Sequence, residues 1–239
     1  MRKYLFIAYP VWLYVIFSVP TLLVSALFYS KFSDLLIINS AGALAMVLIH
    51  LCGKRKKMTQ LPAMPWKRVF LTTGIMLVPV AALTASLTGK AFLNADLVTY
   101  LINCFWSFFW ISCCEELLFR EFLIFRMRKV NIPGWLTVLL PALLFSLCHR
   151  PESVSLLVQR FFLGALLGYL FLKRGDISLN VAVHWVFNIV IYTFQFTLQE
   201  VTALYSAPRA GLNVLLCLLS LLGIVVAYSI NKSKFARYT

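Results

Sequence analysis

Three short polar groups of residues stand out from the long apolar stretches of this sequence, and their side chains are the ones that can do chemistry. Each group lies in a different stretch: Glu115, Glu116 and Arg120 in the first, His149 in the second, and His184 with Asn188 in the third. An ionisable group at mid-depth in a bilayer costs at least about 2.5–3.5 kcal/mol, so it usually marks a site. If these stretches cross a membrane, the three groups predict one functional site.

The spacing within the first and third groups places side chains on common helix faces. Glu116 and Arg120 are one helical turn apart and can pair, whereas Glu115 is rotated by about 100° and can point into a cavity beside them. His184 and Asn188 are also one turn apart. Taken singly, the groups fit a cap where a helix leaves the membrane, an interfacial histidine and a hydrogen-bonded bridge between helices. Their occurrence on three separate stretches favours one shared site.

Two kinds of chemistry suit this set of side chains. Glu115 with His149 can take a proton from a water molecule aimed at a carbonyl group, and His184 with Asn188 can donate to the oxyanion that forms. Arg120 can hold the neighbouring glutamate in its ionised form. Alternatively, two carboxylates and two imidazoles can bind a divalent metal such as zinc. The sequence has no HExxH motif and no serine in a nucleophile elbow, so zincins and serine hydrolases are not indicated.

The composition shows which environment must hold these residues. Of the 239 residues, 62% are apolar and 13% are charged, against about 45–50% and roughly 25% in soluble domains. The net charge of +14 lies in short basic clusters between apolar runs. This pattern is typical of a membrane protein rather than of a protein that binds nucleic acid. The sequence therefore predicts an all-helical, polytopic protein that forms a single transmembrane domain over residues 1–239.

Eight apolar stretches are long enough to cross the hydrocarbon core, which takes about 20 residues: 5–29, 34–52, 69–88, 97–119, 134–149, 154–172, 177–197 and 210–230. They lack the two-residue alternation of a membrane β-barrel. Lys and Arg gather at alternate ends of these spans, around residues 2–3, 54–57, 67–68, 126–129, 173–174 and 232–237. Both termini are therefore expected in the cytoplasm. The first stretch exceeds the roughly 7–15 residues of a signal-peptide core, which favours an uncleaved span.

These boundaries create one geometric difficulty. Glu115 falls near the cytoplasmic end of span 97–119, whereas His149 falls at the opposite end of span 134–149, about 24 Å of helix from Pro133. A tilt, a kink at Pro141 or a span that starts deeper would bring the two side chains together. We therefore expect the span boundaries, and not the grouping of the polar residues, to need revision.

The three groups also have the order and internal spacing of a known family. Residues 115–120 have the pattern EExxxR, residues 145–149 the pattern FxxxH, and residues 184–188 the pattern HxxxN. On these motifs the sequence resembles the CAAX protease and bacteriocin-processing family, also called the Abi family, over about residues 97–195. Members of this family are polytopic membrane proteins that include the eukaryotic Ras-converting CAAX endopeptidase.

The resemblance implies an intramembrane endopeptidase of the glutamate type, with no metal cofactor. Its site residues would be Glu115 and His149 to activate the water, His184 and Asn188 as the oxyanion hole, and Glu116 with Arg120 to orient the first glutamate or bind substrate. One departure is Glu121, which follows the arginine where many bacterial members have glycine and where an extra carboxylate would alter substrate access.

The resemblance also implies partners and a location. The substrate would be a membrane-associated peptide or protein, which in the eukaryotic branch is a prenylated C-terminal CAAX segment cut after the lipidated cysteine. The sequence of the first motif resembles that of bacterial members, so we expect the protein in the bacterial inner membrane. Roles such as bacteriocin maturation are then expected. Membrane lipid is an expected partner and nucleic acid is not. The alternative is a non-catalytic membrane protein for self-immunity or membrane-protein assembly, whose polar groups serve helix packing.

Overall fold

A computed structural model describes residues 66–88, 96–149, 153–175, 177–205 and 209–235, together with seven scattered positions before residue 45. Over these ranges the chain is all helical and has no strand, as predicted. The helices are α3 (Trp66–Thr88), α4 (Leu97–Ile102), α5 (Phe108–Glu116), α6 (Phe125–Lys129), α7 (Gly134–Cys148), α8 (Val154–Arg174), α9 (Ile177–Tyr205) and α10 (Arg209–Phe235). Two π-helical segments, η3 (Asn103–Ser107) and η4 (Leu117–Ile124), lie between α4 and α5 and between α5 and α6.

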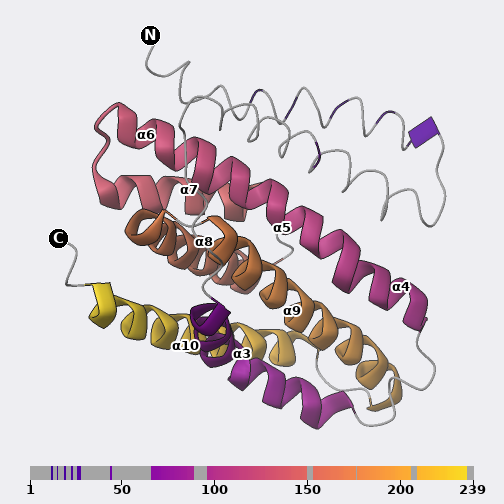
Figure 1. Cartoon of the computed structure of the whole chain (residues 1–239). Coiled ribbons are helices and arrows are strands. Elements are labelled where there is room, and N and C mark those ends of the chain that lie inside the picture. The colour runs from indigo at the N-terminus through magenta and orange to yellow at the C-terminus, as the bar shows by residue number, and fades with distance from the viewer. Residues whose placement is uncertain are drawn as a thin grey trace.

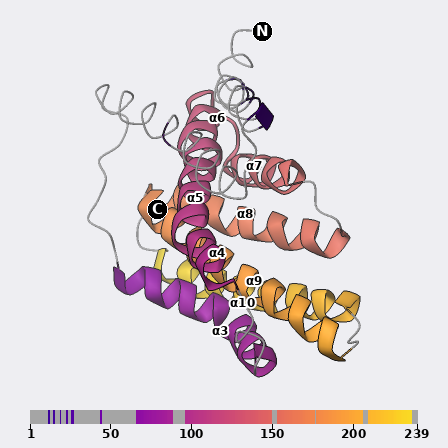
Figure 2. The same cartoon turned by 90° about the vertical axis from the view of Figure 1, so that its right-hand side faces the viewer.

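The segments from α4 to α6 join without a break into one helix, Leu97–Lys129, which runs along one side of the bundle in Figures 1 and 2. The predicted span 97–119 therefore ended ten residues too early. Arg120 and Glu121 directly follow the predicted end of this span, and their side chains are 1% and 3% exposed. Because protein rather than solvent surrounds them, they do not end the helix.

The chain reverses direction after this long helix and again after α8. Residues 130–133 turn the chain from α6 into α7, and Asn131 adopts a left-handed conformation with φ of 60°, which asparagine tolerates better than most residues. Gly175, with φ of 63°, caps the C-terminus of α8 and leads into α9. After the first reversal α7 packs against η4, and after the second α9 contacts α8. Helix α7 also contacts α8.

The helices pack in layers around α8 and α9. On one side α9 contacts α5, and on the other it contacts α3, while α8 lies between α7 and α10 (Figures 1 and 2). Apolar residues of α3, α8, α9 and α10 form one buried cluster, and η4 packs with α7, α8 and the start of α9 in another. Helices α10 and α3 approach closely at Gly223, where an added Cβ would overlap the carbonyl group of Met76.

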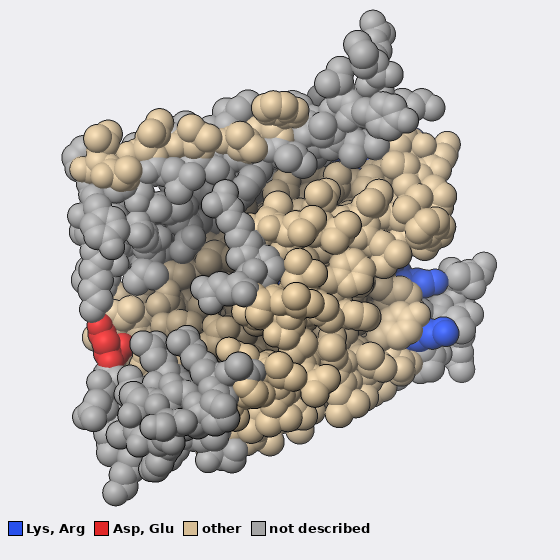
Figure 3. Space-filling view, turned by 180° about the vertical axis from the view of Figure 1, so that it is seen from behind, with Lys and Arg blue, Asp and Glu red and all other residues tan. Residues whose placement is uncertain are grey.

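Four stretches are long and apolar enough to cross a membrane: Leu97–Lys129, Val154–Arg174, Ile177–Phe196 and Gly211–Lys232. Shorter apolar stretches are Phe70–Ala85 in α3 and Gly134–Cys148, the whole of α7. In the view of Figure 3 the described surface is almost entirely uncharged, and charged side chains lie at two opposite edges. The chain is an integral membrane protein. The predicted spans 5–29 and 34–52 lie outside the described residues, so the count of eight spans and the cytoplasmic termini stay predictions.

Candidate active site

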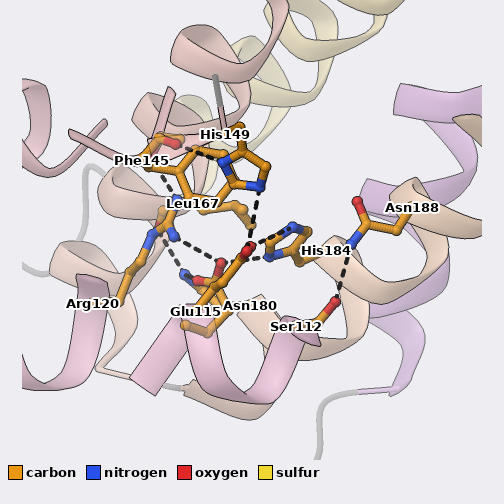
Figure 4. A network of polar contacts seen from close by, with 11 residues as sticks. Ser112, Glu115, Arg120, Phe145, His149, Leu167, Asn180, His184 and Asn188 are labelled. Atoms are coloured by element: carbon orange, nitrogen blue, oxygen red, sulfur yellow. Dashed lines mark hydrogen bonds and ion pairs between the residues drawn. The ribbon is translucent and has the colours of Figure 1, made fainter. Parts of the chain in front are cut away.

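Helix lengths bring Glu115 and His149 together. From Glu115 to Lys129 the long helix rises by about 21 Å, and the 15 residues of α7 run back by about 22 Å. His149, which directly follows α7, therefore lies beside Glu115, with its Nε2 atom 3.3 Å from Oε1 of the carboxylate (Figure 4). The expected difficulty is resolved because the long helix continues past residue 119, which leaves Glu115 near its middle.

Glu116 is the centre of a closed polar network. Its side chain is 0% exposed, and Oε1 lies 2.9 Å from Nη1 of Arg120 and 2.8 Å from Nδ1 of His184. Oε2 accepts a hydrogen bond of 3.1 Å from the amide of Asn180. A guanidinium, an imidazole and an amide from two helices thus converge on the Glu116 carboxylate, which holds them together.

Arg120 is fixed on its other sides by α8 and α7. Its Nη2 atom donates 3.2 Å to the backbone carbonyl of Gly164, and its guanidinium carbon lies 4.9 Å from the ring centre of Phe145. Gly164 has little room for a side chain, because a Cβ there would lie 3.0 Å from the Cα atom of Ala142. Arg120 therefore links the first motif to α7, which carries the second motif, and to α8, which lines the cavity described below.

The FxxxH spacing has a direct structural reason. Nδ1 of His149 lies 2.6 Å from the backbone oxygen of Phe145, one turn earlier in α7. A carbonyl oxygen only accepts, so this contact requires a proton on Nδ1 and turns Nε2 toward Glu115. The carbonyl belongs to the last turn of α7, where helix carbonyls lack internal partners. His149 therefore caps its own helix while it presents Nε2 to the first motif.

His184 contacts both glutamates at once. Its Nδ1 atom faces Glu116 at 2.8 Å, and its Nε2 atom lies 3.5 Å from Oε2 of Glu115. The Glu115 carboxylate therefore lies between two imidazole Nε2 atoms (Figure 4).

A cavity of about 400 Å³ lies directly beside this cluster. His149, His184 and Asn188 line it, together with residues of α8 that include Arg160. The Asn188 amide also donates to the hydroxyl group of Ser112 over a long distance of 3.4 Å. All six predicted site residues thus gather within one region, with the two histidines and Asn188 at the cavity and Glu116 and Arg120 behind them. Glu121 is buried and is not among the residues that line this cavity.

The sequence analysis missed Asn180, which is fully buried in α9. Its side-chain amide donates both to Glu116 and, at 2.8 Å, to the backbone carbonyl of Leu167 in α8. The signal was present in the spacing, because Asn180, His184 and Asn188 follow one another at intervals of four and share one face of α9. The HxxxN motif is therefore the second half of a longer NxxxHxxxN face.

The sequence also left open a metal site at these residues. Within the described residues, no group of three or more His, Cys, Asp or Glu side chains is arranged to hold a metal ion. Both imidazole Nδ1 atoms already have protein partners, and both Nε2 atoms face the same carboxylate. The arrangement suits proton transfer between a carboxylate and an imidazole at the edge of a cavity.

The fold and site define a class: a polytopic helical membrane protein whose buried carboxylate and imidazole groups meet at a cavity between helices. Comparison with protein families gives one match. Residues 97–190 match the family model described as type II CAAX prenyl endopeptidase Rce1-like, and all three motifs lie inside that match. This match agrees with the family resemblance found in the sequence. No curated protein and no solved structure matches the chain.

Proposed function

We propose that this protein is an intramembrane endopeptidase that hydrolyses a peptide bond of a membrane-associated or lipidated substrate. The observation that carries the proposal is the position of the Glu115 carboxylate between the Nε2 atoms of His149 and His184, 3.3 and 3.5 Å away. Both histidines line the cavity, so a water molecule in it lies next to a base and to the carbonyl group of a substrate peptide bound there. The match of residues 97–190 to the model of a protease family supports this assignment.

The reaction uses one water molecule and the groups at the cavity. Glu115 and His149 together accept a proton as the water oxygen bonds to the carbonyl carbon, and the carbonyl electron pair moves onto its oxygen. Asn188 and His184 donate hydrogen bonds to this oxyanion. The 3.5 Å contact between His184 Nε2 and Glu115 is longer than a hydrogen bond, so the substrate oxygen can replace it. The carbon–nitrogen bond then breaks, and the stored proton passes to the leaving amine.

Glu116 and Arg120 do not take part in this proton transfer. Their ion pair of 2.9 Å, with the hydrogen bond from Asn180, holds His184 by its Nδ1 atom and keeps Nε2 turned toward the cavity side. This fixed orientation matters because catalytic groups act only from within hydrogen-bonding reach of the atoms they serve. The proposed reaction needs no metal ion.

The proposed substrate is a prenylated C-terminal CAAX segment, cut after the lipidated cysteine, in keeping with the family description. The proposed location is the bacterial inner membrane, where precursors of bacteriocins or other membrane-anchored peptides are further candidates. Non-catalytic self-immunity or assembly remains the competing function, and no contact in the described structure specifically favours it.

The test uses purified full-length protein in phosphatidylcholine vesicles and a fluorescent peptide that ends in a farnesylated CAAX sequence. We expect release of the three C-terminal residues by the wild type and a loss of about 10²–10⁴-fold in kcat for Glu115→Gln and for His149→Ala. Arg128→Gln, at an exposed position on α6, is the matched control and retains activity. If the wild type cleaves neither this peptide nor its unprenylated form, the protease assignment is wrong and the packing role gains.

A further inference from the structure

An apolar groove of about 380 Å³ lies between α7, α8 and α10, and none of its lining residues also lines the cavity at the candidate active site. The described side chains that line it carry no charge. Trp135 of α7, Phe162 of α8 and Val225 of α10 are exposed along it. Because α8 and α10 supply two of the apolar spans, these exposed side chains face the lipid of a membrane. The groove is therefore open to hydrocarbon chains.

Helices α8 and α10 run parallel to each other beside this groove. Near the start of their shared stretch the amide of Gln159 donates to the hydroxyl group of Ser220 at 2.8 Å. Further along both helices, the rings of Tyr169 and Tyr228 contact each other edge to face at the groove, with their centres 4.8 Å apart. Similar steps along the two helices therefore lead to neighbouring positions.

Two lysines lie just beyond this pair of tyrosines. Lys173 follows Tyr169, and Lys232 follows Tyr228, by one helical turn, so the lysines continue the same helix faces. Both are exposed, and each lies in the last turn of its apolar span. None of the three helices that form the groove contains an acidic residue. Because neighbouring like charges repel each other, the two ammonium groups favour an anion beside them.

We propose that the groove binds one anionic phospholipid, with an acyl chain between α7, α8 and α10 and its phosphate at Lys173 and Lys232. Along α8 the rise from Phe162 to Lys173 is about 16 Å, close to half of the roughly 30 Å hydrocarbon core. A chain that hangs from the lysines therefore fills the groove within one leaflet. The surrounding lipid is equally apolar, so the groove alone does not select among lipids. The selectivity comes from the lysines, as in other basic pockets between membrane helices.

The test is native mass spectrometry of the full-length protein in detergent, with equal amounts of phosphatidylglycerol and phosphatidylcholine that carry the same acyl chains. We expect the wild type to retain phosphatidylglycerol over phosphatidylcholine by roughly 30-fold, because each lysine beside a lipid phosphate contributes about 5-fold. Lys173→Gln and Lys232→Gln each lower this ratio by about 5-fold, and the double variant retains both lipids equally. The matched control is Lys129→Gln, which keeps the ratio. Lys129 is exposed at the end of α6, and its amine lies over the ring of Phe125 on the same helix.

A further variant tests the place of the acyl chain. Ala165 lines the groove, so Ala165→Phe fills it and lowers retention of both lipids by a similar factor, with thermal unfolding as the check on folding. If this variant does not fold, the lysine variants at their exposed positions decide the proposal alone.

The proposal is overturned if the wild type retains both lipids equally or retains neither. It is also overturned if Lys129→Gln lowers the ratio as much as the two groove lysines do, because the effect is then one of general surface charge. Undiminished retention of phosphatidylglycerol by folded Ala165→Phe overturns it as well, since the lysines then bind a phosphate without an acyl chain in the groove. None of these outcomes depends on peptide cleavage, so the proposed function is tested separately.

Discussion

We predict that substitution by Gln has different effects at the two adjacent glutamates of the candidate site. It lowers stability at Glu116 and removes activity at Glu115. Glu116 is 0% exposed, forms an ion pair with Arg120, contacts Nδ1 of His184 and accepts a hydrogen bond from Asn180. Replacement of Glu116 by Gln turns one of its two acceptor oxygens into a donor. Whichever way the amide is turned, its NH₂ group faces a donor of Arg120 or of Asn180. Glu116→Gln therefore breaks a buried network from its centre.

Glu115 is more exposed, at 19%, and its contacts are the Nε2 atoms of two histidines. An amide at this position donates to an imidazole nitrogen that lacks a proton and accepts from one that carries it. Glu115→Gln therefore preserves the packing of the site while it removes the carboxylate that accepts the proton of water. We expect it to fold normally and to lose activity.

The magnitudes separate the two variants clearly. Removal of one partner of a buried charge pair costs about 3–5 kcal/mol, which corresponds to a fall in Tm of about 10 °C for a chain of this size. We expect this fall for Glu116→Gln, measured by thermal unfolding in detergent, against less than about 1 kcal/mol for Glu115→Gln. In the peptide-cleavage assay, Glu115→Gln loses about 10²–10⁴-fold in kcat at unchanged Tm.

A double variant provides the control for the buried network. Glu116→Gln combined with Arg120→Met removes both charges, so no unpaired cation remains, and we expect it to recover at least half of the lost Tm. The reasoning is refuted if Glu116→Gln is as stable as the wild type, or if Glu115→Gln is the less stable of the two. Equal activity losses at equal Tm would also contradict the separate roles of the two carboxylates.

Three further predictions concern helix packing, the oxyanion site and metal dependence. Gly223→Ala lowers Tm by several degrees because its Cβ overlaps the backbone of Met76. Asn188→Ala lowers kcat by about 10²–10³-fold with little change in Tm, because its amide serves the oxyanion and makes only a 3.4 Å contact in the resting protein. Dialysis against a metal chelator leaves peptide cleavage unchanged, because the buried carboxylates already have protein partners.

Each of these predictions has a defined control. Gly74→Ala, where an added Cβ meets nothing within 4 Å, should leave Tm unchanged or slightly raise it, since alanine favours helix more than glycine. An equal loss in Tm at both glycines would contradict the packing argument. Full activity of Asn188→Ala would remove it from the oxyanion site. Loss of activity on chelation, with recovery on addition of zinc, would restore the metal-centre alternative.

The grouping of the site residues was predictable from the sequence because ionisable residues are costly in apolar helices. Glu115, His149 and His184 could be singled out by type and place alone, and the structure brings the Nε2 atoms of both histidines within 3.5 Å of the Glu115 carboxylate. The helix boundaries were less predictable for the same reason. Arg120 and Glu121 directly follow the predicted end of span 97–119, whereas burial within the protein lets the helix continue to Lys129. Charge marks a membrane boundary only where it faces water.

The partners of each polar atom could not be predicted, because they depend on which helices pack together. Asn180 lies on the HxxxN face, but only the contact of α9 with α5 and α8 shows that it bridges Glu116 and the carbonyl of Leu167. Arg160 lies inside the predicted span 154–172 but was not among the predicted site residues. Its place at the cavity follows from the packing of α8 against α7.

The tandem arrangement of the glutamates explains how one helix can supply two carboxylates with different duties. Adjacent residues differ by about 100° in direction, so Glu116 points into the closed network and Glu115 toward the two histidines. Arg120, one turn later, pairs at 2.9 Å with Glu116, so Glu115 is left to the imidazoles. Because His184 contacts both carboxylates, the structural pair positions the reacting one. Glu116→Gln would therefore weaken both duties, whereas Glu115→Gln removes only the carboxylate that accepts the proton of water.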